Sequence, residues 1–223
     1  MKKQKIFIAC DTTSLKKIKK IIKETQNSKL IFGYKFGLQL LNSKNGRKFV
    51  SSLKNKITFG DYKLADIPNT CVSAIKAVRD LKFNYITIHI SSGLKALKAA
   101  KKVSGKTKLI GVTILTSLDN KSLKEIGFEK EVKKLVLHQA KLASKAKLDA
   151  IVCSPQEIKI VKKVFKKEII TPGIRLSGDS KDDQKRVMTP KQAFQNGATA
   201  LVIGRSLTDN IKKNIQKLIR ELN

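Results

Sequence analysis

The stretch ITFGDYKLADIPNTCVSAIKAV, residues 57–78, joins a short apolar run, a charged segment and a helical pattern. Ile57–Asp61 is typical of a buried strand, whereas Val72, Ile75 and Val78 recur at helical spacing. The same order, strand and then helix, repeats along the whole chain. Seven further β-rich runs are Lys5–Cys10, Leu30–Phe36, Asn84–Ile90, Lys108–Ile114, Asp149–Cys153, Glu168–Thr171 and Thr199–Ile203.

Strands that alternate with helices pair in parallel, because a crossover helix carries the chain from each strand to the next. Eight such units in 223 residues predict an α/β fold: a single (β/α)8 TIM barrel that forms one domain over residues 1–223. A doubly wound open sheet is the alternative, although it rarely uses eight strands this evenly. The sequence has no linker or break in composition that would divide the chain.

Composition limits the classes of function. The formal net charge is +31 at pH 7, but 42 of the 48 basic residues are Lys and only 6 are Arg. Proteins that read bases and phosphates favour the bidentate fork of Arg, and a chain without Trp has few stacking platforms. We therefore expect no specific nucleic-acid partner, only weak adsorption to polyanions at low salt.

The apolar runs are all shorter than the roughly 18 residues of a membrane helix, so we expect no membrane partner and a cytoplasmic location. Cys10, Cys71 and Cys153 are odd in number and far apart. We expect them to be small buried side chains rather than a disulfide framework or a zinc site.

A barrel of this kind carries its functional groups where the strands end and in the loops that follow. Polar residues gather at these positions in the sequence, whereas the opposite loops, such as Leu53–Lys56, are plain solvated turns. The polar residues at the predicted strand ends are Asp11, Lys35, Asp61 with Lys63 and Asp66, His89, Thr116 with Ser117, Ser154, Arg175 with Gln184, and Gly204 with Arg205.

The densest pattern is DYKLADIPNT, residues 61–70, in which three charges alternate in sign over six positions. If strand geometry continues through Lys63, Asp61 and Lys63 point to the same side. Lys35, at the end of the second strand, would extend the row, giving Lys-Asp-Lys-Asp with Asp66. The alternative is an ordinary surface salt-bridge cluster.

Glycine-bearing loops follow the seventh and eighth predicted strands: TPGIR at residues 171–175 and IGR at residues 203–205. Such loops bind phosphate in many barrels, because glycine lets backbone N–H groups approach the anion and Arg clamps it. The alternative is that Arg175 and Arg205 pair with neighbouring helices. The polar segment Leu176–Lys185 is expected to be a mobile lid.

Taken together and in this order, these motifs resemble the orotidine 5′-phosphate decarboxylase family over nearly the whole chain. The resemblance implies a lyase that converts orotidine 5′-phosphate to UMP, the last step of de novo pyrimidine nucleotide synthesis, without metal or organic cofactor. It looks like the shorter bacterial branch. The motifs that carry the resemblance are ACD (9–11), YKFG (34–37), DYKLADIPNT (61–70), VTILTS (112–117), VCSP (152–155), TPGIR (171–175), DQKR (183–186) and IGR (203–205).

The resemblance also implies a role for each matched residue. Lys63 would protonate C6 of the pyrimidine, and Asp61 would face the departing carboxylate. Lys35 would hold the charged array and contact the ribose. In a homodimer with shared active sites, Asp66 and Thr70 would reach into the neighbouring subunit's site. The remaining substrate contacts implied are Asp11 at a ribose hydroxyl, Thr116 with Ser117 at the pyrimidine amide, and Gln184, Gly204 and Arg205, with Arg175 at the loop base, at the phosphate.

Two other functions stay open at this stage. One is a Mg²⁺-dependent sugar-phosphate decarboxylase or aldolase of the same barrel suprafamily, against which the continuation IPNT, residues 67–70, argues. The other is a basic RNA-binding protein built on a barrel. We expect His89 to be structural or to support the site indirectly, because the implied mechanism needs no histidine base, and His138 to be structural.

Overall fold

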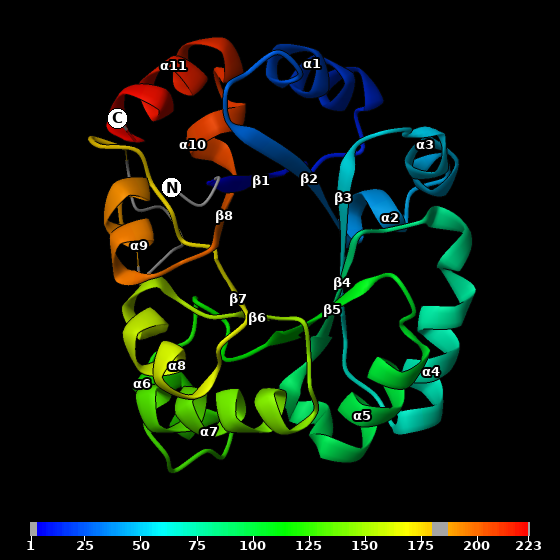
Figure 1. The fold of residues 1–223 in the computed structure, drawn as a ribbon, viewed down its shortest axis with the longest axis vertical. Helices are drawn as coiled ribbons and strands as arrows, with labels where there is room; N and C mark the ends of the chain where they lie inside the picture. Colours follow the sequence, from blue (N-terminus) through cyan, green and yellow to red (C-terminus); the bar gives the residue numbers. More distant parts are fainter. Residues whose placement is uncertain (1–3, 180–186, 223) are drawn as a thin grey trace.

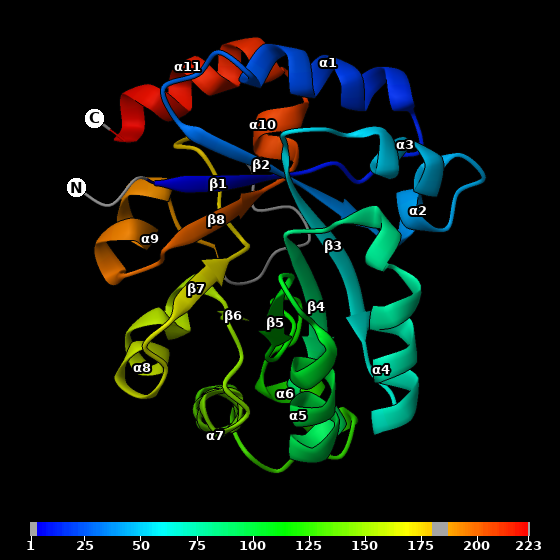
Figure 2. The ribbon, with the colours of Figure 1, turned by 45° about the vertical axis from the view of Figure 1, so that its right-hand side comes forward.

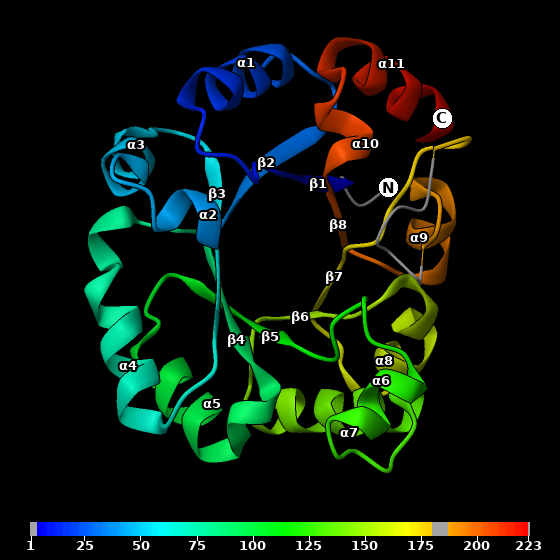
Figure 3. The ribbon, with the colours of Figure 1, turned by 180° about the vertical axis from the view of Figure 1, so that it is seen from behind.

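The computed structural model describes residues 4–179 and 187–222. Its strands are all parallel, each pairs with the next in sequence, and β8 (Ala200–Ile203) closes on β1 (Lys5–Ala9). Figures 1 and 3 show this barrel from its two sides, ringed by helices. The predicted (β/α)8 TIM barrel is therefore confirmed. The strands between are β2 (Ile31–Gly37), β3 (Ile57–Leu64), β4 (Tyr85–His89), β5 (Lys108–Val112), β6 (Ala150–Val152) and β7 (Glu168–Thr171).

Helices follow the strands, with additional short helices in the loops beyond the eight or so expected. Helix α1 begins after Ser14, whose hydroxyl accepts the Lys17 N–H at 3.4 Å, and it buries Ile18, Ile21 and Ile22. The helices are α1 (Leu15–Thr25), α2 (Leu38–Leu41), α3 (Gly46–Ser52), α4 (Pro68–Ala77), α5 (Gly93–Val103), α6 (Asn120–Glu125), α7 (Val132–Lys145), α8 (Ile158–Val164), α9 (Pro190–Asn196), α10 (Arg205–Thr208) and α11 (Ile211–Leu222), with 3₁₀ turns at Arg79–Leu81, Ile90–Ser92 and Pro155–Glu157.

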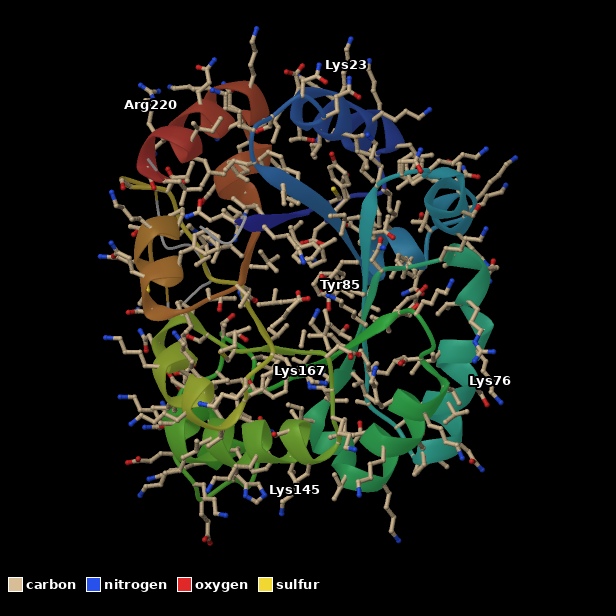
Figure 4. All side chains as sticks on the ribbon, viewed as in Figure 1. Lys23, Lys76, Tyr85, Lys145, Lys167 and Arg220 are labelled. Carbon is tan, nitrogen blue, oxygen red and sulfur yellow. The ribbon has the colours of Figure 1, made fainter. Side chains whose placement is uncertain are left out.

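Lysines occupy the outer faces of these helices. Lys23, Lys76 and Lys145 extend from the rim of the molecule in Figure 4, which places much of the +31 charge in solvent. Helices α1 and α11 are in contact and are neighbours on the outside of the barrel in Figures 1 and 2. Within the described ranges, no helix is both long and apolar enough to cross a membrane.

Aromatic side chains fill one layer of the barrel interior. The rings of Phe7, Phe59 and Tyr85 meet there, with Phe7 edge-to-face on Phe59 at 5.2 Å and on Tyr85 at 5.1 Å between centroids. Tyr85 is seen inside the barrel in Figure 4. A Cβ on Gly33 would lie 2.7 Å from the Phe7 ring, so the ring needs a glycine beside it. This layer is a packed floor beneath the polar residues that follow on the same strands.

Candidate active site

Four charged side chains, from β2, β3 and the loop that follows β1, form a continuous row at the mouth of the barrel. The Lys63 Nζ donates to Asp61 Oδ2 at 2.7 Å, and the Lys35 Nζ lies 3.4 Å from the same oxygen. Lys35 also donates to Asp11 Oδ1 at 2.9 Å. Asp61 and Lys35 are buried, whereas the Lys63 and Asp11 side chains are 36% and 57% exposed. The row therefore faces both the barrel interior and the solvent, which an ordinary surface cluster would not do.

Strand β3 continues through Lys63, but its geometry there is irregular, whereas the sequence analysis considered a regular strand. Lys63 has a φ of +48°, and the ladder between β3 and β4 shifts register between Gly60 and Leu64. A left-handed φ is costly for a lysine and is a local strain of the kind found at functional sites. The Lys63 ammonium nevertheless reaches Asp61, so the two side chains meet although the regular strand geometry on which that prediction depended is absent at Lys63.

The electrostatics of the row favour charged groups in spite of burial. Burial by itself would raise the pKa of Asp61, but the ammoniums of Lys35 and Lys63 more than reverse this and hold that pKa below its usual value. Burial would likewise lower the pKa of Lys35, yet the carboxylates of Asp61 and Asp11 hold it above its usual value. Asp61 and Lys35 are therefore ionised together at neutral pH.

Gly37, at the end of β2, makes room for this row. A Cβ at this position would lie 2.8 Å from Asp11 Oδ1 and 3.6 Å from the Lys35 Nζ. A side chain here would push apart the ion pair that places Asp11 over the mouth. The glycine of the YKFG motif is thus explained by close approach of a carboxylate.

A cavity of about 1120 Å³ opens above the row, and this volume is large enough to hold a nucleotide-sized ligand. It extends outward from Asp61 and Lys63 to the surface between α1 and α11, where Lys17, Lys20 and Lys212 add positive charge. The sequence-predicted residues that line it are Asp11, Lys35, Asp61, Lys63, Thr116, Ser117, Arg175, Gly204 and Arg205.

The loops after β7 and β8 meet at one side of this cavity, as expected for an anion site. Gly204 is the N-cap of α10 and Arg205 its first residue, while Arg175 follows β7, and all three line the cavity. The base of the β7 loop is closed by the Arg175 N–H, which donates to the Met188 carbonyl at 3.1 Å. Gln184, the remaining predicted phosphate contact, lies outside the described residues.

Residues 176–185 were predicted to form a mobile lid. In the described part, Leu176 is buried, the Ser177 N–H donates to Glu221 at 2.8 Å, and Lys217 donates to Asp179 at 3.0 Å. These contacts attach the start of the segment to α11. Residues 180–185 of the predicted lid lie outside the described residues.

Asp66 and Thr70 lie apart from the other predicted site residues. Both are exposed at the start of α4, and neither is among the described residues that line the main cavity. The Asp66 carboxylate accepts the Ile67 N–H at 2.7 Å and borders a smaller neighbouring cavity with Ser91 and Ser92. Within one chain, Asp66 therefore does not extend the charged row.

The two histidines differ in position. His89 ends β4 half-buried, and burial together with the nearby Lys63 charge lowers its pKa. His138 is exposed on α7. Ser154 is buried outside the cavity lining and caps a 3₁₀ turn by accepting the Gln156 N–H at 3.3 Å. The three cysteines are buried and form no disulfide, and burial raises the pKa of the Cys10 thiol to about 12.

Sequence reasoning missed two features of the site. Thr87, in the middle of β4, accepts the Lys63 backbone N–H at 2.8 Å and donates to Asp61 Oδ1 at 3.0 Å. Its only sequence signal is a polar residue at the inward-facing position between Tyr85 and His89. Lys17 and Lys20 of α1 were not predicted as site residues, because helical periodicity does not reveal that they border a cavity.

Fold and site together define a (β/α)8-barrel protein with a lysine–aspartate row beneath a cavity lined by arginine and lysine. The chain belongs to the orotidine 5′-phosphate decarboxylase / HUMPS family, whose model matches residues 4–215. It is 42% identical over 224 residues to an orotidine 5′-phosphate decarboxylase of Prochlorococcus marinus (strain MIT 9215), covering 94% of this chain and 91% of that one.

Two further proteins agree with this assignment. An orotidine 5′-phosphate decarboxylase of Carboxydothermus hydrogenoformans is 37% identical over 234 residues, which are 98% of this chain and 96% of that one. The crystal structure of the orotidine 5′-phosphate decarboxylase from Lactobacillus acidophilus superposes with a TM-score of 0.79 at 27% identity, covering 98% of each chain.

Proposed function

We propose that this protein decarboxylates orotidine 5′-phosphate to UMP and so performs the last step of de novo pyrimidine nucleotide synthesis. The observation that carries the proposal is the buried Asp61 carboxylate bound by the ammoniums of Lys63 and Lys35, beneath a cavity that Arg175 and Arg205 also line. The matched relatives bear the name of this activity. Because membranes retain phosphorylated nucleotides, we also propose a cytoplasmic location.

In the proposed reaction, the bond between C6 and the carboxylate breaks, CO₂ leaves, and the electron pair stays on C6. The Lys63 ammonium stabilises this carbanion and gives a proton to C6, after which the neutral amine regains a proton from water. The Asp61 carboxylate disfavours the substrate carboxylate beside it, and this repulsion is relieved as CO₂ departs. In this scheme Lys63 and Asp61 are the groups that act on the reacting carbon and its carboxylate.

The rest of the site would bind and orient the nucleotide. Asp11 and Lys35 reach the ribose, Thr116 with Ser117 reads the pyrimidine amide, and the phosphate lies between Arg175, Gly204 and Arg205, with Gln184 as a further contact. Binding energy from the phosphate, remote from C6, holds the substrate carboxylate against Asp61. This division explains why much of the cavity lining is far from the reacting carbon.

Purified protein should remove the orotate absorbance band of orotidine 5′-phosphate and yield UMP. We expect Lys63→Ala to lose more than nine-tenths of kcat while retaining the fold and UMP binding, because it loses both the proton donor and a cation at C6. The reaction should proceed unchanged in EDTA. An unchanged absorbance band in wild-type protein, or a Mg²⁺-dependent reaction on a sugar phosphate instead, would reject the proposal.

We further propose that the active enzyme is a homodimer in which the partner subunit's Asp66 and Thr70 complete each site. Asp66 is exposed within the chain, and the neighbouring Ile67 is 66% exposed, which suits burial in an interface between subunits. A two-fold axis would then build two equivalent sites, each with a fourth charge in its row.

Mixing two inactive variants tests the shared site. Lys63→Ala and Asp66→Ala homodimers should each be severely impaired. After subunit exchange, about half of the dimers are hybrids with one intact site, so about a quarter of all sites should recover. If Asp66 served its own chain, no intact site could form. Exchange without recovery of activity, or a fully active monomer, would therefore reject the shared site.

A further inference from the structure

The backbone of β3 loses its regular pairing at the catalytic lysine. Between Gly60 and Leu64 the register with β4 shifts, and Lys63 adopts a φ of +48°. A backbone N–H at such a bulge needs an acceptor from outside the ladder, because a buried unpaired N–H costs about 1–3 kcal/mol. The Lys63 N–H finds that acceptor in the Thr87 Oγ1, 2.8 Å away.

The chemistry of these groups fixes the direction of each hydrogen bond around Thr87. A backbone N–H can only donate, so the Thr87 oxygen accepts from Lys63. The hydroxyl proton remains available, and the ionised Asp61 carboxylate, which can only accept, takes it at 3.0 Å through Oδ1. Asp61 Oδ2 is then left to the ammoniums of Lys63 and Lys35, at 2.7 and 3.4 Å.

We propose that Thr87 is a positioning residue, which sets Asp61 and Lys63 in one fixed arrangement through a single hydroxyl group. Thr87 is 1% exposed, is β-branched, and pairs with Ile110 of β5, so its own side chain has little freedom to move. It is not among the described residues that line the cavity, and it therefore acts on the reaction through its two neighbours.

The inference rests on the proposed decarboxylation and makes a separate claim about how the reaction geometry is held. Without the hydroxyl, the Lys63 backbone loses its partner at a strained position, and Asp61 loses the bond that orients its Oδ1. The Lys63 ammonium and the Asp61 carboxylate can then move relative to the substrate. A displacement of about 1 Å can lower the rate roughly 10²-fold.

The test compares Thr87→Val, which keeps the shape and removes the hydroxyl, with Thr87→Ser, which keeps the hydroxyl. We expect Thr87→Val to lower kcat about 10²-fold while the KM and the Kd for UMP change by less than about 3-fold, because the phosphate and ribose contacts remain. Thr87→Ser should recover kcat to within about 5-fold of wild type.

The pH profile separates positioning from a merely structural effect. Burial raises the pKa of Asp61, and the charges of Lys35 and Lys63 and the Thr87 hydrogen bond lower it. Loss of that bond should move the acid limb of kcat to higher pH in Thr87→Val but not in Thr87→Ser. Thr113→Val is the matched control, because Thr113 is also buried but donates to the Val152 carbonyl at 2.8 Å, and it should leave the profile unchanged.

Each outcome has a stated meaning. A Thr87→Val enzyme with kcat within 3-fold of wild type, a loss confined to KM, or a Thr87→Ser variant as impaired as Thr87→Val would overturn the role of Thr87. Should Thr87→Val fail to fold, Thr87→Ala provides a second hydroxyl-free variant for the same comparison. If wild-type protein itself leaves orotidine 5′-phosphate unchanged, the proposed function fails rather than this inference.

Discussion

Replacing Asp61 by Asn should destabilise the folded protein, because it removes the carboxylate that two ammoniums share. Breaking one partner from a buried ion pair typically costs about 3–5 kcal/mol. Here Lys35 keeps Asp11 at 2.9 Å and the Lys63 side chain is 36% exposed, so both cations retain other solvation. We therefore expect a loss near the lower limit, about 3 kcal/mol, which corresponds to roughly 6–12 °C in Tm.

Urea denaturation at fixed protein concentration measures this change, since subunit association would add to the apparent stability. Asp11→Asn is the matched control: it removes a carboxylate from the same lysine, but that carboxylate is 57% exposed and should contribute about 0–1 kcal/mol. An Asp61→Asn protein as stable as wild type, or only as affected as Asp11→Asn, would refute the reasoning.

The pH dependence of the same comparison gives an internal check. Burial raises the pKa of Asp61, but Lys35 and Lys63 lower it below the usual value of about 3.9, so the folded state binds its proton less readily than the unfolded state does. The contribution of the ionised group is complete above about pH 3.9 and disappears as the pH falls through the folded-state pKa. The stability gap between wild type and Asp61→Asn should therefore be constant from about pH 5 to 7 and shrink in more acidic solution.

Two further predictions concern the basic side of the cavity. Arg205→Ala should lower kcat/KM for orotidine 5′-phosphate by a factor that corresponds to a few kcal/mol of transition-state stabilisation. It should hardly change kcat/KM for the nucleoside orotidine, which lacks phosphate. An equal loss on both substrates would contradict a phosphate clamp. Lys17→Ala combined with Lys20→Ala should lower kcat/KM about 3-fold at low salt and not at 1 M salt, where charges are screened within about 3 Å. The exposed lysines Lys16 and Lys19 of the same helix give the control pair, whose effect should be smaller if position at the cavity matters.

Most of the barrel could be predicted because each strand is a short β-rich run between helical patterns. β7 (Glu168–Thr171) was predicted with its observed limits, and β1, β2 and β4 within one residue at each end. The prediction for β3 stopped at Asp61, three residues early, because its last part is charged and bulged and so lacks the apolar pattern of a buried strand.

The site could be predicted in its charges but not in its geometry. Asp61, Lys63 and Lys35 follow strand ends, and parallel strands bring such positions together. The left-handed backbone of Lys63 and the two bonds of Thr87 depend on the register between β3 and β4, which no local pattern encodes. Asp66 does not join the row within one chain, and the partner subunit that would bring it there stays a prediction from the family resemblance.

Exchange of the C6 hydrogen of UMP in D₂O tests most directly whether Lys63 moves the proton at C6. Decarboxylation and this exchange share the same carbanion, so the wild-type protein should place deuterium at C6, as followed by NMR, at a rate proportional to enzyme concentration. Lys63→Ala should bind UMP and show no exchange above background. Exchange by Lys63→Ala at the wild-type rate, or active decarboxylation by a wild-type enzyme that never exchanges C6, would contradict the account.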